Sequence, residues 1–454
     1  MDFLPRGLLA HLEALLPRTG SEIAPAARDT SPGASSSAFE RASKPLAAPL
    51  SALGWYRVGE DGRLCFITKS EHYHTPLGHG FPGFGLVETA RRLGIPNATH
   101  NNTRGHITRL LEERLVEAAT TGSEGGPRLE RVLNLQTGSL AVEAAFKMCA
   151  ARFFAHEAGG AAKFAGRVPV FIVVGDERGS PAGNYHGTTA FVQTLRGLWP
   201  GLCARMTDQG ILRVAVVRPN NDGDLRETFE RWERPPHKVA AFFHEIVMMN
   251  YGALLLRPEF LRLAYGLCAH HDVPTVADEI QSCLWAPGLY LFREYGLKPD
   301  ILAVGKGFSG GEYAASRVLF SSEMDGLSQF GALVTNGQEE LASLTYLITM
   351  RWALANEAPI RRLGDLYADR LRDLVTRRPD RLEAVQGSRH MSALRFHNLA
   401  DAAAFARTLN GMGLDISAQT YKADCPPVVL TKLPLIATER AIKFVLDRME
   451  RALA

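Results

Sequence analysis

Residues 301–311 read ILAVGKGFSGG, and this stretch decides how the rest of the chain is interpreted. Its first four residues form an apolar run that predicts a buried strand, and the run leads directly to Lys306, which lies between Gly305 and Gly307. By itself the window favours a lysine on an exposed β-turn, because charged residues are seldom buried without a partner. The remaining sequence must therefore indicate whether Lys306 faces solvent or a ligand.

Further apolar runs precede and follow this stretch, and helical segments separate them. Most of these runs are apolar throughout rather than alternating, which is typical of strands covered on both faces. Helical patterns occupy 140–157 and 258–270, and the second begins with a proline, which favours a first helical turn. The alternation predicts an α/β fold with a doubly wound, mostly parallel sheet. The predicted strands are 131–137, 168–175, 211–218, 238–247, 273–280 and 300–306.

The two ends of the chain depart from this pattern. Residues 19–50 are rich in Ser, Ala and Pro and follow a short amphipathic helix near residues 6–16, which indicates a linker or surface extension. After residue 338 a long helix leads into a mixed α/β tail that ends in another helix. We predict an N-terminal extension, a segment contributing to a small domain and the substrate entrance, a large domain and a C-terminal small domain, over residues 1–50, 51–105, 106–335 and 336–454.

Composition excludes several classes of protein. The chain has 454 residues, 46% of them hydrophobic and 22% charged, and a net charge of +3, which does not favour binding to nucleic acid or an acidic membrane. No apolar run reaches the length of a membrane span, and the N-terminus lacks the pattern of a signal peptide. The six cysteines form no CxxC pair or Cys/His cluster, which predicts reduced thiols, no metal site and a cytoplasmic location.

Polar residues lie where several predicted strands end, and ligands of doubly wound sheets bind at that edge. Thr137, Gly138 and Ser139 occupy a strand-to-helix turn, where free N–H groups favour an anion; a simple helix cap by Ser139 is the alternative. Asp278 ends an apolar strand, where a carboxylate is costly unless it faces a cation or hydrogen-bond donors; helix capping is again the alternative.

The stretch GNYHGTTAF adds a flat aromatic surface at Tyr185 and His186. An aromatic residue buried in a loop is the alternative, because it would give the same sequence pattern. Together these motifs fit a ligand with an anion, an aromatic ring, a cationic ring nitrogen opposite Asp278 and an electrophile near Lys306. Pyridoxal phosphate has all four groups, and its aldehyde forms a Schiff base with a lysine. A cofactor in front of Lys306 would explain why a strand ends in this residue.

The ordered motifs resemble the class-III pyridoxal-phosphate-dependent aminotransferases, which belong to fold type I and the aspartate aminotransferase superfamily. The resemblance covers roughly residues 53–454, and the set is specific although each piece alone is weak. It implies a large cofactor-binding domain and a smaller α/β domain made from both chain ends. The matching pieces are TGSLAVEAAFKMCAARF, YHG, DEIQ, FREYGLKPDILAVGKGFSGG and the helix opening after Thr335.

The resemblance also implies a role for each matching residue. Lys306 would form the Schiff base and then carry protons, and Asp278 would keep the pyridine nitrogen protonated. Gln281 would bond the cofactor's phenolic oxygen, and Tyr185 would stack on its ring. Thr335 would reach the phosphate bound by a second subunit, so a homodimer or a dimer of dimers is expected. The implied cofactor-binding set is Thr137, Gly138, Ser139, Tyr185, His186, Glu245, Asp278, Gln281, Lys306 and Thr335.

The substrate half departs from the family pattern. Many members that use glutamate or ornithine read YHG-Arg, where this chain has Thr188, and carry a gating glutamate where it has Asn250. Ile246 replaces a proline, Lys432 lies near the place of the gate's arginine partner, and CLWAPGLY replaces the usual Gly-Arg-Thr-Gly. We therefore expect an altered substrate or reaction. Candidates to line the substrate entrance are His72, Tyr73, His74 and Phe81.

Three functions follow from this interpretation. The leading one is an aminotransferase for a non-standard amine or carbonyl compound in a specialised biosynthetic pathway. The second is an enzyme that keeps the cofactor but acts as a decarboxylase, an epimerase, a mutase or a lyase. The sequence does not distinguish these four reactions. The third is an inactive relative used as a binding or scaffold subunit. The amino donor and acceptor are not identified by the sequence.

Overall fold

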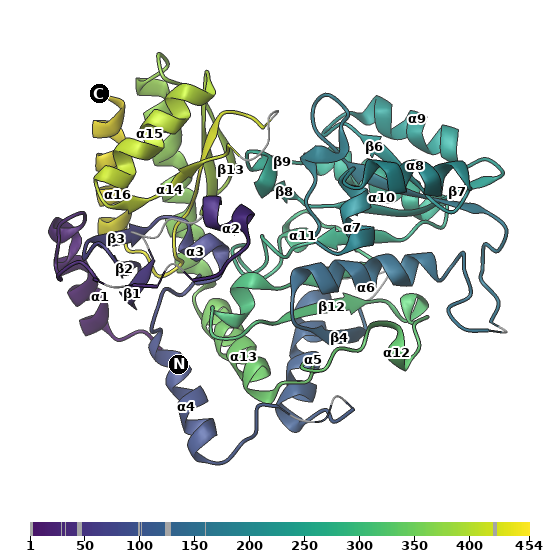
Figure 1. Ribbon diagram of the computed structural model, residues 1–454, viewed down its shortest axis with the longest axis horizontal. Helices are drawn as coiled ribbons and strands as arrows, with labels where there is room; N and C mark the ends of the chain where they lie inside the picture. Colours follow the sequence, from purple (N-terminus) through teal and green to yellow (C-terminus); the bar gives the residue numbers. More distant parts are fainter. Residues whose placement is uncertain are drawn as a thin grey trace. The chain divides into compact units, whose positions relative to one another are not determined.

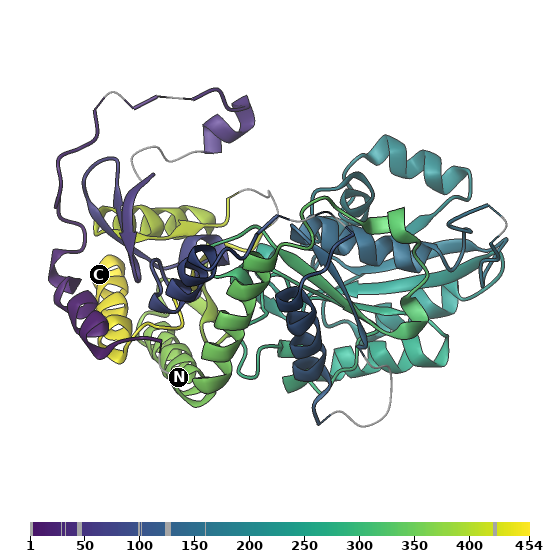
Figure 2. The same ribbon diagram turned by 90° about the horizontal axis from the view of Figure 1, so that it is seen from below.

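The computed structural model describes every residue except 1–2, 29, 32, 43–47, 99, 101, 123–128, 159 and 421–424. Parts of the predicted N-terminal extension therefore lie outside the described residues. The chain divides into two compact units (Figure 1; Figure 2). Unit 1 combines residues 1–85 with 358–454, and unit 2 comprises residues 86–357. The helix predicted after residue 338 thus lies in unit 2, whereas the rest of the C-terminal tail lies in unit 1.

Unit 2 is built on a seven-stranded sheet in the order β4-β12-β11-β10-β7-β5-β6. Neighbours from β11 to β6 are parallel, and β12 runs antiparallel to both β11 and β4. This confirms the prediction of a mostly parallel sheet. The strands are β4 (Arg131–Leu135), β5 (Val168–Val174), β6 (Arg213–Val217), β7 (His237–His244), β10 (Thr275–Asp278), β11 (Ile301–Val304) and β12 (Ser316–Phe320).

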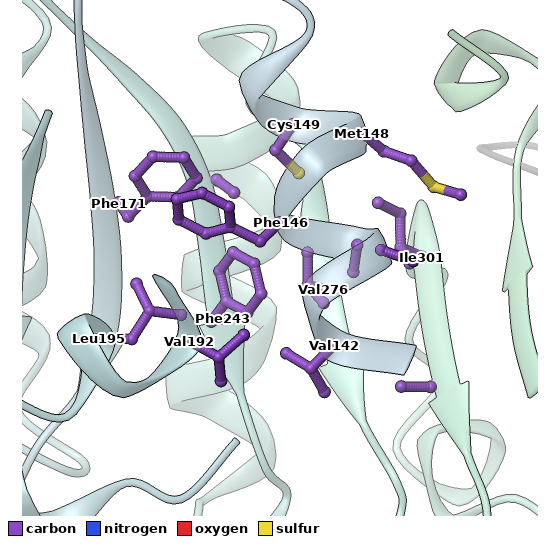
Figure 3. Packing of buried hydrophobic residues seen from close by; sticks show 14 of the residues in the cluster. Val142, Phe146, Met148, Cys149, Phe171, Val192, Leu195, Phe243, Val276 and Ile301 are labelled. Carbon is purple, nitrogen blue, oxygen red and sulfur yellow. The ribbon is translucent and has the colours of Figure 1, made fainter. Parts of the chain in front are cut away.

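Helices cover both faces of this sheet. On one face, Phe146 of α6 (Gly138–Ala150) stacks on Phe171 of β5 with ring centroids 4.4 Å apart, and Phe171 lies 6.2 Å from Phe243 of β7 (Figure 3). α7 (Ala190–Leu195) and α8 (Pro200–Asp208) add Val192 and Met206 to this core. On the other face, α10 (Pro258–His270) packs against β7.

The remaining elements of unit 2 connect or flank the sheet. The hairpin of β8 and β9 follows β7, so the strand predicted at 238–247 is interrupted after His244. These elements are α4 (Gly85–Arg92), α5 (His106–Thr120), α9 (Asp222–Trp232), α11 (Leu291–Glu294), α12 (Gln329–Ala332), α13 (Glu340–Ala355), β8 (Val247–Met248) and β9 (Leu254–Leu255).

Helix α6 ends at Ala150, seven residues before the predicted end, and this expectation was wrong. Beyond it the chain turns so that Phe153 packs against Phe164, with ring centroids 5.4 Å apart, and the carbonyl of Arg152 accepts the N–H of Phe164. The apolar pattern continues through residues 153–154 and therefore hides the end of the helix.

Unit 1 contains two small sheets and their helices. The sheets have the orders β1-β2-β3-β15 and β13-β14-β17-β16. Within the described ranges, none of the chain's helices combines the length and apolar character that crossing a bilayer requires. The elements are α1 (Arg6–Ala14), α2 (Ser37–Ala42), α3 (Ser70–Tyr73), α14 (Glu357–Arg377), α15 (Leu399–Gly411), α16 (Glu439–Leu453), β1 (Pro49–Leu53), β2 (Tyr56–Gly59), β3 (Leu64–Ile67), β13 (Leu382–Ser388), β14 (Met391–Phe396), β15 (Leu414–Asp415), β16 (Ser417–Ala418) and β17 (Val428–Lys432).

Candidate active site

Lys306 follows β11 (Ile301–Val304) by two residues, and Gly305 makes the turn between them. A Cβ on Gly305 would lie 2.3 Å from Oγ of Ser316, so only glycine fits this turn. Lys306 itself has φ of 36°, a strained value for a residue with a side chain. Burial lowers the pKa of Lys306 to about 8, although the carboxylates of Glu245 and Asp278 favour its charged form.

Asp278, the last residue of β10, faces a histidine. Its Oδ2 lies 2.8 Å from Nδ1 of His186, and its Oδ1 accepts the N–H of Ile280 at 3.1 Å. Both side chains are almost fully buried, with 4% and 1% exposed. Nε2 of His186 is also buried and has no hydrogen-bond partner among the described residues. Residues 279–290 contain turns but no helix, so Asp278 does not cap one.

Three predicted site segments converge on the side chain of Ile280. A Cβ on Gly138 would approach Cγ2 of Ile280 to 2.9 Å, and a Cβ on Gly305 would approach its Cδ1 to 3.0 Å. Both glycines are thus required by close approach rather than by a turn alone. The start of α6, the DEIQ segment and the turn before Lys306 therefore meet at one end of the sheet.

The YHG segment joins the same cluster through the first turn of α6. A Cβ on Gly187, whose φ is 138°, would lie 2.8 Å from Cα of Ser139. The N–H of Thr188 donates to Oγ of Ser139 at 3.0 Å, and their hydroxyls lie 3.1 Å apart. Thr137, not Ser139, caps α6, because its Oγ1 accepts the N–H of Leu140 at 3.3 Å. The alternative of a cap by Ser139 is wrong.

Gln281 and Glu245 form a buried polar pair in the cluster. Nε2 of Gln281 donates to Oε1 of Glu245 at 3.1 Å, and each residue is 4% exposed. Glu245 directly follows β7, so the pair connects the ends of two neighbouring parallel strands. The hydrogen bond fixes which way the Gln281 amide points.

Glu279 points away from this cluster although it follows Asp278. It is fully buried, and its two oxygens accept the N–H groups of Leu291 and Phe292 at 2.8 and 2.5 Å. Burial raises the pKa of Glu279 to about 7, against the lowering effect of these two donors. The residue therefore closes the first turn of α11 and has a structural role.

Tyr185 is half-buried, and an arginine covers its ring. Cζ of Arg196, the residue that follows α7, lies over the ring at 5.2 Å from its centroid. Arg196 could not be found from the sequence, because ten residues of loop and helix separate it from Tyr185 and no periodicity links the two.

The remaining predicted residues differ in how far they are exposed. Thr188 is exposed on the YHG loop, and Thr335 is exposed two residues before Gly337. Asn250 is half-buried in the short helical turn Met249–Tyr251 that follows β8. The structure of unit 2 thus brings together the segments that contain Gly138, Asp278 and Lys306, with the YHG loop packed against the start of α6.

The entrance candidates belong to unit 1. Tyr73 is 1% exposed, and Nζ of Lys432, itself fully buried, lies over its ring at 4.2 Å. His72 and His74 are exposed, whereas Phe81 is buried against Phe84. The backbone from Ser70 to Tyr73 is left-handed, with φ between 47° and 76°, which non-glycine residues adopt only when their surroundings hold them.

Comparisons with known proteins identify the family. The family model described as aminotransferase class-III matches residues 43–453. This chain belongs to the class-III aminotransferases. The ornithine aminotransferase of Bordetella pertussis is 27% identical over 392 residues, which cover 82% of this chain and 84% of the relative. This family is pyridoxal-phosphate-dependent, so the protein is a pyridoxal-phosphate-dependent aminotransferase of fold type I, and the expectation of an inactive scaffold is not supported.

Solved structures support the same fold. A transaminase from the marine bacterium Virgibacillus has a TM-score of 0.76 at 17% identity, covering 93% of this chain and 95% of its own. The ornithine aminotransferase from Toxoplasma gondii has a TM-score of 0.71 at 21% identity, covering 92% and 93%. At these identities the likeness concerns the fold alone.

The clustered residues fit pyridoxal phosphate chemically. Gly138 has no side chain where an anion would approach the N-terminus of α6, and a buried carboxylate at Asp278 suits a protonated ring nitrogen. The amine of Lys306, with its lowered pKa, suits an aldehyde. Among the described residues, no group of three or more His, Cys, Asp or Glu is arranged to hold a metal ion.

Proposed function

We propose that this aminotransferase moves an amino group between a non-standard amine donor and a carbonyl acceptor in a specialised biosynthetic pathway. The observation that carries the proposal is the amine of Lys306, whose pKa burial lowers to about 8, in a turn that converges with the DEIQ segment and the start of α6. At near-neutral pH such an amine is partly uncharged, and only the uncharged form attacks an aldehyde.

Bound pyridoxal phosphate supplies an aldehyde that exchanges amino groups and a ring that withdraws electrons from the substrate. Asp278, oriented by His186 at 2.8 Å, holds a proton on the ring nitrogen. Nζ of Lys306 would hold the cofactor covalently, and the same amine would move a proton from the substrate's α-carbon. Gln281, oriented by Glu245 at 3.1 Å, donates a hydrogen bond to the ring oxygen.

The first turn of α6 binds the phosphate in this proposal. Thr137, Gly138 and Ser139 surround backbone N–H groups whose helix dipole favours an anion. Tyr185 stacks on the ring. Thr335 is exposed, which suits a hydroxyl that reaches the phosphate bound by a second copy of the chain. We therefore propose a homodimer or a dimer of dimers.

The substrate half supports a donor other than L-glutamate. Thr188 brings a hydroxyl rather than a cation, and this hydroxyl lies 3.1 Å from that of Ser139. Asn250 is uncharged. A second carboxylate buried without a cation costs roughly 2–5 kcal/mol, so glutamate should bind its second carboxylate poorly. Because several relatives are named ornithine aminotransferases, ornithine is a donor to test.

A cytoplasmic location stays a prediction. It is supported by the cysteines: all six lie in described parts of the chain, and none forms a disulfide.

The reaction is tested by a single half-reaction. The purified holoenzyme is mixed with one donor at a time, and conversion of the bound cofactor to its pyridoxamine form is followed by absorbance and mass spectrometry. Transamination predicts one equivalent of pyridoxamine phosphate and one of carbonyl product per site. Release of carbon dioxide, a racemised donor or an eliminated group without pyridoxamine would instead assign one of the other pyridoxal-phosphate reactions. Lys306→Ala is the control and should release no carbonyl product catalytically.

A further inference from the structure

Arg196 presents a guanidinium group beside the cofactor site. Its Cζ lies over the ring of Tyr185 at 5.2 Å from the ring centroid. Tyr185 directly precedes His186, whose Nδ1 lies 2.8 Å from Asp278. The guanidinium therefore covers the aromatic residue that adjoins the buried His–Asp pair.

The backbone of Arg196 is fixed against the loop that carries this aromatic ring. Nδ2 of Asn184, which is 2% exposed, donates to the carbonyl of Leu195 at 2.9 Å. A Cβ on Gly197 would lie 2.7 Å from Cγ of Pro181, so the backbone at Gly197 packs closely against Pro181. Contacts on both sides of Arg196 thus hold it in place, and its position does not depend on the cation–π contact alone.

The charge of Arg196 has no acidic partner in the part of the chain that the structure describes. Other arginines of unit 2 do hold carboxylates: Arg152 pairs with Asp272 at 2.5 Å, and Arg218 binds Asp224 through two nitrogens. A guanidinium carries five N–H donors in a planar fork, and contact with an aromatic face uses none of them. These donors are available to an acceptor that the chain itself does not provide.

We propose that Arg196 binds an oxyanion of the reacting complex, either the substrate's carboxylate or the cofactor's phosphate. The proposal rests on the proposed function, in which Tyr185 stacks on the cofactor ring, so that the groups joined to this ring lie near Tyr185. Carboxylate and phosphate present the same chemistry to arginine, two oxygens that accept parallel N–H bonds. If the anion is the carboxylate, the substrate class narrows to amino or keto acids with one carboxylate beside the reacting carbon.

The test compares Arg196→Gln with the wild-type holoenzyme in two binding assays. In the first, glutarate and benzoate are titrated into the holoenzyme by calorimetry, with the uncharged amides as controls. In the second, the apoenzyme binds pyridoxal phosphate or pyridoxal, which lacks the phosphate. A substrate carboxylate predicts about a tenfold or greater loss of affinity for the carboxylates and no change for the amides. A cofactor phosphate predicts a loss of that size for pyridoxal phosphate but not for pyridoxal.

Two further variants sharpen the test. Arg205→Gln removes an exposed arginine of the nearby helix α8 and should change neither assay. Arg196→Lys keeps the charge without the planar fork and should recover part of the lost affinity. Unchanged affinities in both assays for Arg196→Gln would overturn the proposal. So would an equal loss for pyridoxal phosphate and pyridoxal with no carboxylate effect, because Arg196 would then only position Tyr185.

The binding assays need no turnover, so their result is separate from that of the half-reaction. Failure of the holoenzyme to form pyridoxamine phosphate with any donor would contradict the proposed function, whereas the affinities would still decide the role of Arg196.

Discussion

Glu279→Ala should destabilise unit 2 strongly while leaving the chemistry at Lys306 in place. The two oxygens of Glu279 accept the N–H groups of Leu291 and Phe292 at 2.8 and 2.5 Å, and those two residues are 2% and 3% exposed. Alanine removes both acceptors from donors that water does not reach. Each unsatisfied buried donor costs about 1–3 kcal/mol, so the loss should be about 2–6 kcal/mol.

Asp278→Asn is the matched control, one residue away. Asparagine has the same shape and keeps an oxygen for the N–H of Ile280, now accepted at 3.1 Å. Its amide can donate to Nδ1 of His186 when the ring proton is on Nε2, so stability should fall less than in Glu279→Ala. The variant loses the charge opposite the ring nitrogen, so the substrate's α-proton should be lost more slowly while the cofactor stays bound. The two substitutions should therefore have different effects: Glu279→Ala should lower the stability of unit 2, whereas Asp278→Asn should slow the reaction.

Thermal unfolding and proton exchange separate these outcomes. For a unit of this size, 2–6 kcal/mol corresponds to a midpoint lower by about 4–10 °C. Circular dichroism of both variants at pH 8 gives the midpoints, and deuterium exchange at the donor's α-carbon gives the chemistry. A midpoint for Glu279→Ala within about 2 °C of the wild type would refute the structural role of Glu279. An unchanged exchange rate for Asp278→Asn would mean that another group pairs with the ring.

The remaining predictions concern the cofactor. Lys306→Ala should abolish turnover and the visible absorbance of covalently bound cofactor while the fold persists; retained turnover with a native substrate would contradict the assignment. Because burial lowers the pKa of Lys306 to about 8, the uncharged amine increases as pH rises to that value. Cofactor attachment to the apoenzyme should therefore speed up about tenfold per pH unit and level off near pH 8, and a rise that continues to about pH 10.5 would indicate an ordinary lysine. Thr335→Ala should weaken cofactor affinity in a dimer, and a fully active monomer by light scattering would argue against a shared site.

Most strands of the large sheet, and the close approach of the Gly138 and Gly305 segments, could be predicted from the sequence because their signals are local. β11 is a run of four buried apolar residues, and Gly305 and Gly138 mark places where the backbone must approach Ile280. β12 was missed, because it contains Arg317, which a local pattern assigns to the surface. This arginine is 1% exposed, and its NH1 donates to the carbonyl of Leu135 at 3.1 Å, a contact across 182 residues.

Contacts between residues far apart in the sequence also explain which features of the site could not be predicted. Asp278 and Glu279 are adjacent acids, and only their distant partners distinguish the carboxylate that faces His186 from the one that accepts the N–H groups of α11. Arg196 approaches Tyr185 because Asn184 holds the carbonyl of Leu195, and no motif records that hydrogen bond. Long-range partners decide such roles, and they appear only in the folded chain.

The central claim is that the cofactor half of the site is intact while the substrate half no longer suits glutamate. The most direct measurement is the rate at which single donors convert the bound cofactor to pyridoxamine phosphate, with L-glutamate compared against ornithine, monocarboxylic amino acids, simple amines and amino sugars. Because Thr188 and Asn250 offer no cation for a second carboxylate, L-glutamate should react far more slowly than the best donor. Conversion by L-glutamate as fast as by any other donor would contradict the account.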